Sequence, residues 1–188
     1  GFGARGLAAG MVAAGGGVAR RRGGGPDRRG KGCCAWPGRD APELSSGEDW
    51  YARSRAVADE QGPPMRTYTL RQRRAAQGEV DVDFVLHGET GPASRWAVHA
   101  RPGDRVVLLA PDADCAESSQ GREWKPLAGG GQVLLVADET ALPAVAGILE
   151  ELAAQVAPPR VLALLEVADQ GSAIALKAPP GAELVWLP

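Results

Sequence analysis

The sequence predicts an antiparallel β-barrel followed by a Rossmann-like α/β domain. In residues 37–128, short segments of alternating apolar and polar residues are separated by turns rich in Gly and Pro, as is typical of an antiparallel barrel. From residue 129 onwards, continuous apolar runs flank one amphipathic helix, which is typical of a parallel βαβ unit. Residues 1–36 fit neither pattern.

In the first of these domains, three strands are expected at residues 66–71, 80–86 and 105–110, with a short helix near 93–99. The apolar residues of the second strand alternate with Asp81 and Asp83, which indicates burial of one face. Gln77-Gly78 marks the turn before it.

In the second domain, strands are expected at residues 132–137, 161–167 and 183–187, each buried on both faces, with a helix over residues 140–156. Thr140 is the expected N-cap. The apolar residues of this helix recur at helical spacing: Leu142, Val145, Ala146, Leu149, Leu152, Ala153 and Val156.

Both ends of the chain depart from this plan. Residues 1–36 hold 12 of the 26 glycines, and six Arg and one Lys face the single acid Asp27, which gives about +6 in a chain of net charge −2. We expect this low-complexity basic segment to be disordered or read in the wrong frame, the alternative being a basic tail for an anionic partner. The barrel is therefore expected to be incomplete at its N-terminus. The α/β domain is expected to be truncated, because Pro188 directly follows a strand.

Composition excludes several classes of protein. The net charge of −2 argues against nucleic-acid binding, and the longest apolar runs are too short to insert in a membrane. Cysteines 33, 34 and 115 form neither a disulfide framework nor a metal-binding spacing, so we expect a cytoplasmic protein. Two histidines are too few for a His-rich metal site, and no metal ligands are assigned.

The first candidate motif is RTYTLR at residues 66–71. A guanidinium at Arg66 suits phosphate oxygens, and the ring of Tyr68 suits a flat ligand. The simpler interpretation is a surface strand with alternating polar groups.

The second candidate runs from Leu86 to Ala97 and includes His87 and Trp96. Gly91 allows close approach to a ligand, and a helix that opens at Ala93 and Ser94 presents backbone N–H groups that attract phosphate. Alternatively, His87 is structural and Trp96 only fills the core.

The third candidate is DETALP at residues 138–143, where a parallel strand meets a helix N-terminus. Ligands of open α/β sheets gather at this edge. The alternative is ordinary helix capping by acids, worth roughly 0.3–1 kcal/mol.

In their order along residues 37–188, these segments resemble the siderophore-interacting protein family of the ferredoxin-reductase superfamily. The resemblance rests on RTYTLR, DVDFVLHG, GPASRWA, GDRVVLLAP and ADETALPAVAGILEEL, and on the strands LALLEVAD and ELVWL. It implies a barrel that binds FAD and an α/β domain that binds NADPH or NADH. One departure is Ala137, where the family usually has Gly.

The resemblance also implies roles for individual residues. Arg66 would contact the FAD pyrophosphate, Tyr68 would pack on the isoalloxazine, and Thr69 would bond near its reactive edge. The implied clamp on flavin and phosphate consists of His87, Gly88, Gly91, Pro92, Ala93, Ser94 and Trp96. The implied nicotinamide-domain loop consists of Asp138, Glu139, Thr140, Ala141 and Pro143.

The activity that the resemblance implies is FAD-dependent reduction of a ferric siderophore by NADPH or NADH, in a protein that is monomeric at full length. The flavin would carry the chemistry, so no protein nucleophile or acid–base pair is assigned. Two alternatives remain at this stage: a general flavin electron carrier, and a fragment that binds flavin or siderophore without catalysis.

Overall fold

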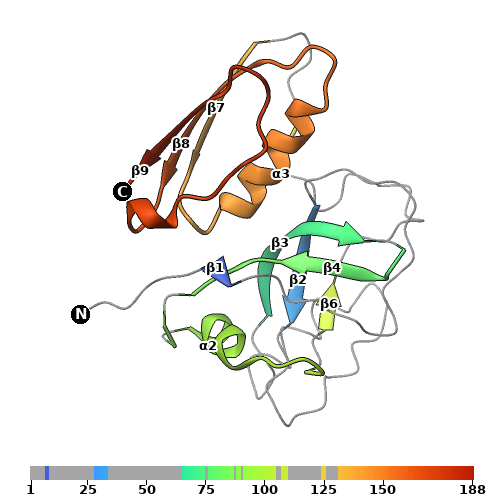
Figure 1. Cartoon of the computed structure of the whole chain (residues 1–188). Coiled ribbons are helices and arrows are strands. Elements are labelled where there is room, and N and C mark those ends of the chain that lie inside the picture. The colour runs from blue at the N-terminus through green and yellow to red at the C-terminus, as the bar shows by residue number, and fades with distance from the viewer. Residues whose placement is uncertain are drawn as a thin grey trace.

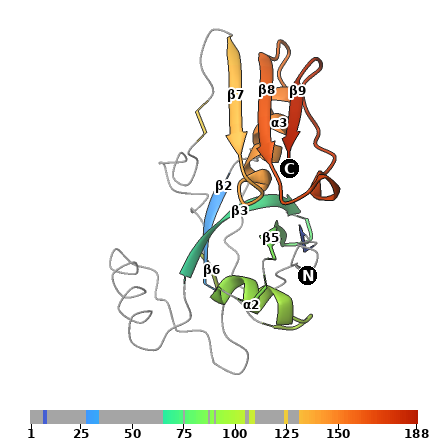
Figure 2. The ribbon, with the colours of Figure 1, turned by 90° about the vertical axis from the view of Figure 1, so that its left-hand side faces the viewer.

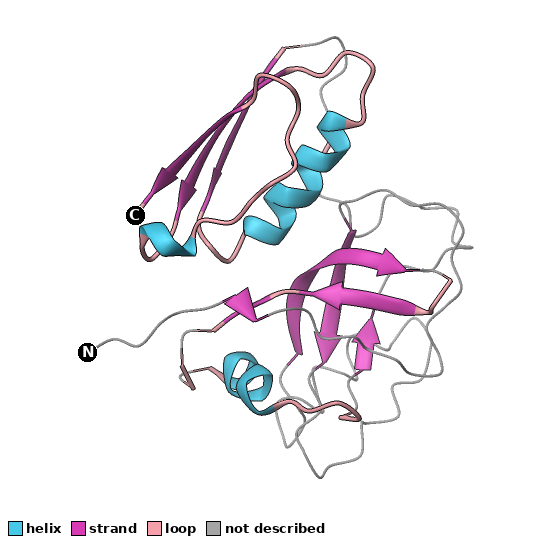
Figure 3. Ribbon diagram, in the orientation of Figure 1, coloured by secondary structure: helices cyan, strands magenta, loops and turns pink. Residues whose placement is uncertain are grey.

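The structure is a computed structural model that describes residues 7–8, 28–33, 65–74, 76–86, 88–89, 91–104, 107–109, 124–125 and 131–188. An antiparallel part and a parallel part lie one above the other in Figure 1, and helix α3 lies between them. Figure 3 shows the same arrangement by type of element, with the helices in cyan and the strands in magenta. The two-domain order expected from the sequence is thus present.

The antiparallel part contains a four-stranded sheet of order β4-β3-β2-β6 and a two-stranded sheet of β1 and β5. Its strands are β1 (Leu7–Ala8), β2 (Arg28–Cys33), β3 (Met65–Arg74), β4 (Glu79–Val82), β5 (Phe84–Val85) and β6 (Val107–Leu109). One helix, α2 (Pro92–His99), follows β5. In the part of the chain that the structure describes, these strands do not close into a barrel.

The expected strand at residues 80–86 is divided at Asp83. β4 pairs with β3, whereas β5 pairs with β1, so the chain changes partner at this residue. A β-bulge in β3 between Leu70 and Gln72 shifts the register of the hairpin just before this point. The predicted inward face is nevertheless confirmed, because Val80, Val82 and Phe84 are all buried.

Within residues 1–36, where the sequence shows no strand alternation, the structure places the strands β1 and β2. β2 lies inside the four-stranded sheet and pairs with β3 on one side and with β6 on the other. A Gly-rich strand such as RRGKGC escapes sequence analysis because it shows no apolar alternation. Its partners supply the pairing that its own composition does not predict.

The parallel part is a βαβ unit extended by one further strand. The sheet has the order β7-β8-β9, and both pairings are parallel. Its elements are β7 (Gln132–Ala137), α3 (Leu142–Ala153), β8 (Arg160–Glu166), the 3₁₀ turn η1 (Gln170–Ser172) and β9 (Glu183–Leu187). The three strands lie side by side in front of α3 when the molecule is turned as in Figure 2.

The ends of α3 differ from the prediction. The helix stops at Ala153, three residues before Val156, which is fully exposed. Two consecutive prolines follow at residues 158–159, and a proline disfavours helical geometry in the residue before it. At the other end the N-cap is Ala141, and Thr140 does not cap the helix with its side chain.

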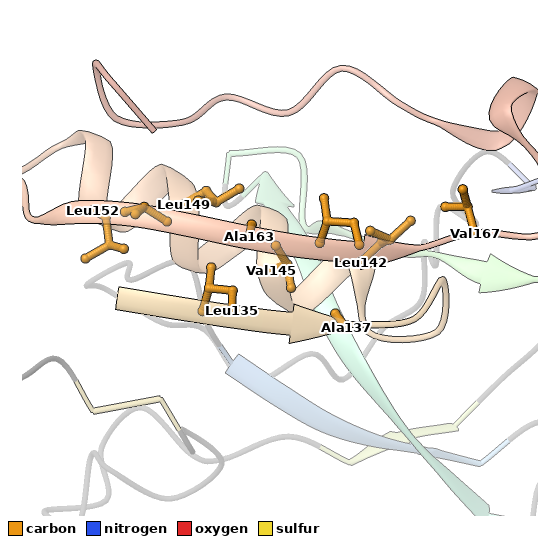
Figure 4. Close-up of a cluster of buried hydrophobic side chains, with 10 residues drawn as sticks. Leu135, Ala137, Leu142, Val145, Leu149, Leu152, Ala163 and Val167 are labelled. Atoms are coloured by element: carbon orange, nitrogen blue, oxygen red, sulfur yellow. The ribbon is translucent and has the colours of Figure 1, made fainter. Parts of the chain in front are cut away.

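The main core lies between α3 and one face of the parallel sheet. Figure 4 shows the side chains of Leu142, Val145 and Leu149 directed from the helix toward those of β7 and β8. Leu149, Ala163 and Leu165 are completely buried. Fully burying one such Leu side chain contributes roughly 1.5–3 kcal/mol, so this contact fixes α3 to the sheet.

Burial of β7 on both faces was predicted and is wrong. Leu134 is 61% exposed and Val136 is 71% exposed, whereas Leu135 and Ala137 between them are buried. The helix covers one face of the strand, and a continuous apolar run does not reveal which face is covered.

Candidate functional site

A cavity of about 480 Å³ lies where the two parts of the molecule meet. Small-molecule sites usually measure about 300–1,000 Å³, so this cavity has the size of a ligand site. Four segments line it. The lining residues are Arg66, Thr67, Tyr68, Thr69, Asp83, Phe84, Val85, Gly91, Ala93, Ser94, Thr140, Ala141, Pro143 and Ala144. The three motifs singled out in the sequence therefore meet at one place.

The first wall is the beginning of β3. Arg66 lies exposed at this wall, and the side chain of Tyr68 is half-buried. The Tyr68 ring lies 4.6 Å from that of Phe84, which lies 5.7 Å from that of Trp96, measured between centroids. Tilted aromatic pairs at this spacing hold one another in place, so Tyr68 presents a supported flat surface to the cavity.

The second wall, residues 83–85, was not predicted as part of the site. The hairpin register places Leu70 opposite Val82, so the residues just before Leu70 lie beside those just after Val82. Pairing the residues on either side of the predicted Gln77-Gly78 turn one by one would have placed residues 83–85 close to the start of β3. Only the one-residue shift at the β-bulge could not have been predicted in this way. The turn itself requires Gly78, whose φ is +70°.

Asp83 is the acidic residue of that wall. Burial raises the pKa of its carboxyl, the charge of Arg71 opposes this rise, and the charge of Asp81 adds to it. Asp81, in contrast, accepts hydrogen bonds from Arg74 at 2.5 and 2.6 Å, which lower the pKa of its carboxyl. Two carboxyls two residues apart thus differ in how readily they ionise, because only Asp81 receives direct hydrogen bonds.

The third wall is the N-terminus of α2. Gly91 is the N-cap, and Ala93 and Ser94 of the first turn line the cavity. The first N–H groups of a helix have no acceptor within the helix, and they attract anions such as phosphate. Ser94 is 4% exposed, and its hydroxyl donates to the carbonyl oxygen of Gly88 at 2.5 Å, which ties the helix to the loop before it.

The remaining residues of the second motif have other positions. Trp96 is 2% exposed and packs in the core with Val82 and Phe84, so it supports the aromatic wall without lining the cavity. Gly88 has a φ of +81°, a conformation that glycine adopts readily. Pro92 occupies the first turn of α2. His87 lies outside the described residues.

The fourth wall is the start of α3 with the loop before it. Thr140, Ala141 and Pro143 of the third motif line the cavity, and Ala144 joins them. Asp138 lies behind this wall: its Oδ1 accepts from the backbone N–H groups of Thr140 at 3.0 Å and Ala141 at 3.2 Å, and from the Thr140 hydroxyl at 2.6 Å. These bonds, the hydroxyl first, lower the pKa of Asp138. Asp138 thus stabilises the turn before α3 and makes no side-chain cap of the helix itself. Glu139 adjoins the wall without lining the cavity.

The described residues hold no cluster of three or more His, Cys, Asp or Glu side chains able to bind a metal ion. Their helices are also too short or too polar to span a bilayer.

Comparison with known families assigns both parts of the chain. Residues 11–115 match the siderophore-interacting FAD-binding domain, and residues 131–188 match the siderophore-interacting protein domain. The chain belongs to the siderophore-interacting protein family. The first match begins at residue 11, inside the segment that the sequence analysis set apart as low-complexity.

Individual proteins that are similar to this chain include two named ferric reductases. Ferric vibriobactin reductase ViuB of Vibrio cholerae is 32% identical over 133 residues, 71% of this chain and 45% of that protein. The NADPH-dependent ferric-chelate reductase of Escherichia coli is 33% identical over 125 residues, 66% of this chain and 45% of that protein. An uncharacterized protein of Mycobacterium tuberculosis is 39% identical over 127 residues, 66% of this chain and 40% of that protein. The chain thus spans less than half the length of these relatives.

Solved structures support the same fold. A siderophore utilization protein from T. fusca matches with a TM-score of 0.69 and 30% identity, over 96% of this chain and 67% of that one. The siderophore-interacting protein SipS from Aeromonas hydrophila matches with a TM-score of 0.61 and 29% identity, over 87% of this chain and 55% of that one. A ferredoxin-NADP⁺ reductase from Plasmodium falciparum, at 11% identity and a TM-score of 0.53, shares the fold alone. This fold joins an FAD-binding domain to a nucleotide-binding domain.

The cavity has the donors that FAD requires. A pyrophosphate needs cationic and N–H donors, which Arg66 and the first turn of α2 supply from two walls. A flat ring system needs an aromatic surface, which the supported ring of Tyr68 supplies. The residues present therefore fit the cofactor of the matching domain.

Proposed function

We propose that this chain binds FAD and a nicotinamide dinucleotide and acts in the reduction of ferric siderophores by NADPH or NADH. The observation that carries the proposal is the cavity in which the phosphate-binding and ring-binding residues of the FAD domain meet the first turn of α3. The names of the reductases among its relatives support the choice of a ferric chelate as the electron acceptor.

In this proposal the FAD-binding residues each hold one portion of the cofactor. Arg66 and the N-terminus of α2 hold the diphosphate, with the Ser94–Gly88 hydrogen bond fixing the loop between them. Tyr68 packs against the isoalloxazine, and the hydroxyl of Thr69 bonds near its reactive edge. When bound, FAD would supply the conversion of two-electron hydride transfer into single-electron transfer, which is what the reduction of Fe(III) requires.

The fourth wall receives the nicotinamide nucleotide. Asp138 organises this wall by accepting three hydrogen bonds from Thr140 and Ala141, which holds the loop against the cavity. Pro143 and Ala144 present small, uncharged surfaces that let the nicotinamide approach the flavin.

The finer organisation of the fold belongs to the same proposal. We assign residues 37–128, together with β2, to an FAD-binding barrel, and residues 129–188 to the NAD(P)H-binding domain. The pairing of β2 with both β3 and β6 supports including this strand in the barrel. We further propose a cytoplasmic location, on the grounds of the sparse cysteines, and no nucleic-acid binding, on the grounds of the net charge of −2. The full-length protein is proposed to be a monomer.

The proposal is tested with protein purified in the presence of FAD. We expect a yellow protein whose flavin absorbance bleaches anaerobically on addition of NADPH or NADH. Adding a ferric siderophore should then restore the absorbance and release Fe(II) to a ferrous-specific chelator. Reoxidation by a ferredoxin with no response to ferric siderophores would instead identify a general electron carrier. A protein that takes up no FAD would refute the proposal.

A further inference from the structure

Helix α3 contacts both sheets, and it does so with different faces. Leu142, Val145 and Leu149 pack against the parallel sheet. Successive residues of an α-helix are rotated by about 100°, so Pro143 and Glu150, seven positions apart, lie on the same face of α3. This second face is turned well away from the core. This second face meets β3 of the antiparallel sheet. A single stiff element therefore spans the boundary between the two parts.

The second face of α3 lies opposite β3 across the cavity and contacts it at an ion pair. Pro143 and Ala144 share the cavity with Thr67 and Thr69. In the ion pair, the guanidinium of Arg71 donates to both carboxylate oxygens of Glu150, with Nη2–Oε1 at 2.6 Å and Nη1–Oε2 at 3.1 Å. Pro143 and Glu150 are about 10 Å apart along the helix, at 1.5 Å per residue. Thr69 and Arg71 are about 7 Å apart along the strand.

The Arg71–Glu150 pair has a defined geometry. The two side chains are 27% and 31% exposed, so each is mostly removed from water. The hydrogen bonds that Arg71 donates to Glu150 raise the pKa of Arg71, although burial opposes this rise. Two parallel hydrogen bonds between a guanidinium and a carboxylate fix direction as well as distance. This ion pair, together with the other contacts between α3 and β3, then restricts the angle at which the two elements cross.

We propose that the Arg71–Glu150 ion pair is a positioning contact that holds the first turn of α3 against the FAD cavity. The proposal rests on the proposed function, because the distance that it controls lies between the nicotinamide side and the flavin side of the cavity. Hydride transfer needs reacting atoms roughly 3–3.5 Å apart, and a misplacement of about 1 Å can cost on the order of 100-fold in rate. A contact remote from the reacting atoms thus controls the reaction through the angle of the helix.

The test uses Glu150→Gln, which keeps the shape of the side chain and removes its charge. The matched control is Glu79→Gln. It removes a carboxylate of β4 that accepts a hydrogen bond at 2.8 Å from Arg74, which lies on β3 like Arg71, so this ion pair stays within one hairpin. We expect Glu150→Gln to accelerate amide hydrogen exchange in residues 138–146 and in β3, and to leave β8 and β9 unchanged. Flavin reduction by NADPH should slow at least tenfold, whereas the FAD dissociation constant should change less than twofold. Glu79→Gln should produce neither effect.

A double-variant cycle shows whether Glu150 acts through Arg71. If it does, Glu150→Gln has no further effect on exchange or on reduction in an Arg71→Gln background. Unchanged exchange in the single Glu150 variant, or an equal effect in both backgrounds, would overturn the positioning role. If the wild-type chain bound no FAD, the proposed function would be refuted. The hydrogen-exchange measurement would still decide whether the ion pair holds the helix in place.

Discussion

Replacing Arg66 with Ala tests the assignment of the FAD phosphate site most directly. In the proposed site, Arg66 lies exposed at the cavity, on the wall that β3 forms. Removing its guanidinium removes charge-assisted hydrogen bonds to the diphosphate and leaves the aromatic wall intact. We therefore expect weaker FAD binding without loss of the fold.

The size of the effect follows from the exposure of the side chain. A hydrogen bond to a charged group contributes about 1.5–3 kcal/mol, and the lower end applies because water competes at an exposed site. A loss of about 1.5 kcal/mol raises the FAD dissociation constant by about tenfold. Tyr68→Phe keeps the half-buried ring beside Phe84 and loses only a hydroxyl, so about 0.5 kcal/mol, or roughly twofold, is expected.

The assay is a fluorescence titration of FAD into apoprotein at low and high salt. Arg160→Ala is the matched control, because it removes an exposed Arg from β8, outside the cavity. The loss caused by Arg66→Ala should shrink in about 1 M salt, where the Debye length falls to about 3 Å. Equal dissociation constants for Arg66→Ala and Tyr68→Phe, or a tenfold loss in the Arg160 control, would refute the roles given to these residues.

Four further predictions concern stability. Leu149→Ala removes a fully buried side chain and should cost about 2–5 kcal/mol in urea unfolding, whereas Val156→Ala, at an exposed position, should cost nearly nothing. Asp81→Asn should destabilise the protein at pH 7, because hydrogen bonds depress the pKa of this carboxyl in the folded state. The stability that the ionised carboxyl contributes is fully present above its unfolded pKa of about 3.9. The difference in unfolding free energy between the wild type and this variant should therefore disappear as the pH falls through the pKa of the folded state. Asp83→Asn should have the opposite sign, stabilising at pH 7, because burial raises the pKa of that carboxyl and makes its ionisation unfavourable; a loss of stability there would contradict this cause. Deleting residues 1–36 should lower the thermal midpoint, since β2 pairs with both β3 and β6; an unchanged midpoint would show that this pairing does not stabilise the sheet.

The sequence determined the elements whose own residues carry a periodic pattern. The alternation through Val80, Val82 and Phe84 predicted a buried strand face, and helical spacing at Leu142, Val145 and Leu149 predicted the buried face of α3. These patterns are local, and burial of one side of a strand or helix requires them. The motifs in order along the chain likewise predicted the family and the segments that form three walls of the cavity.

The tertiary structure decided what depends on a partner. The Gly-rich β2 is a strand because β3 and β6 flank it, and a composition without apolar alternation does not predict that pairing. The exposure of Leu134 and Val136 depends on which face of the sheet α3 covers. The place of Asp83 in the cavity follows from hairpin register, and the pairing of Arg71 with Glu150 joins residues 79 positions apart. Such contacts arise from the packing of stiff elements, which no local pattern encodes.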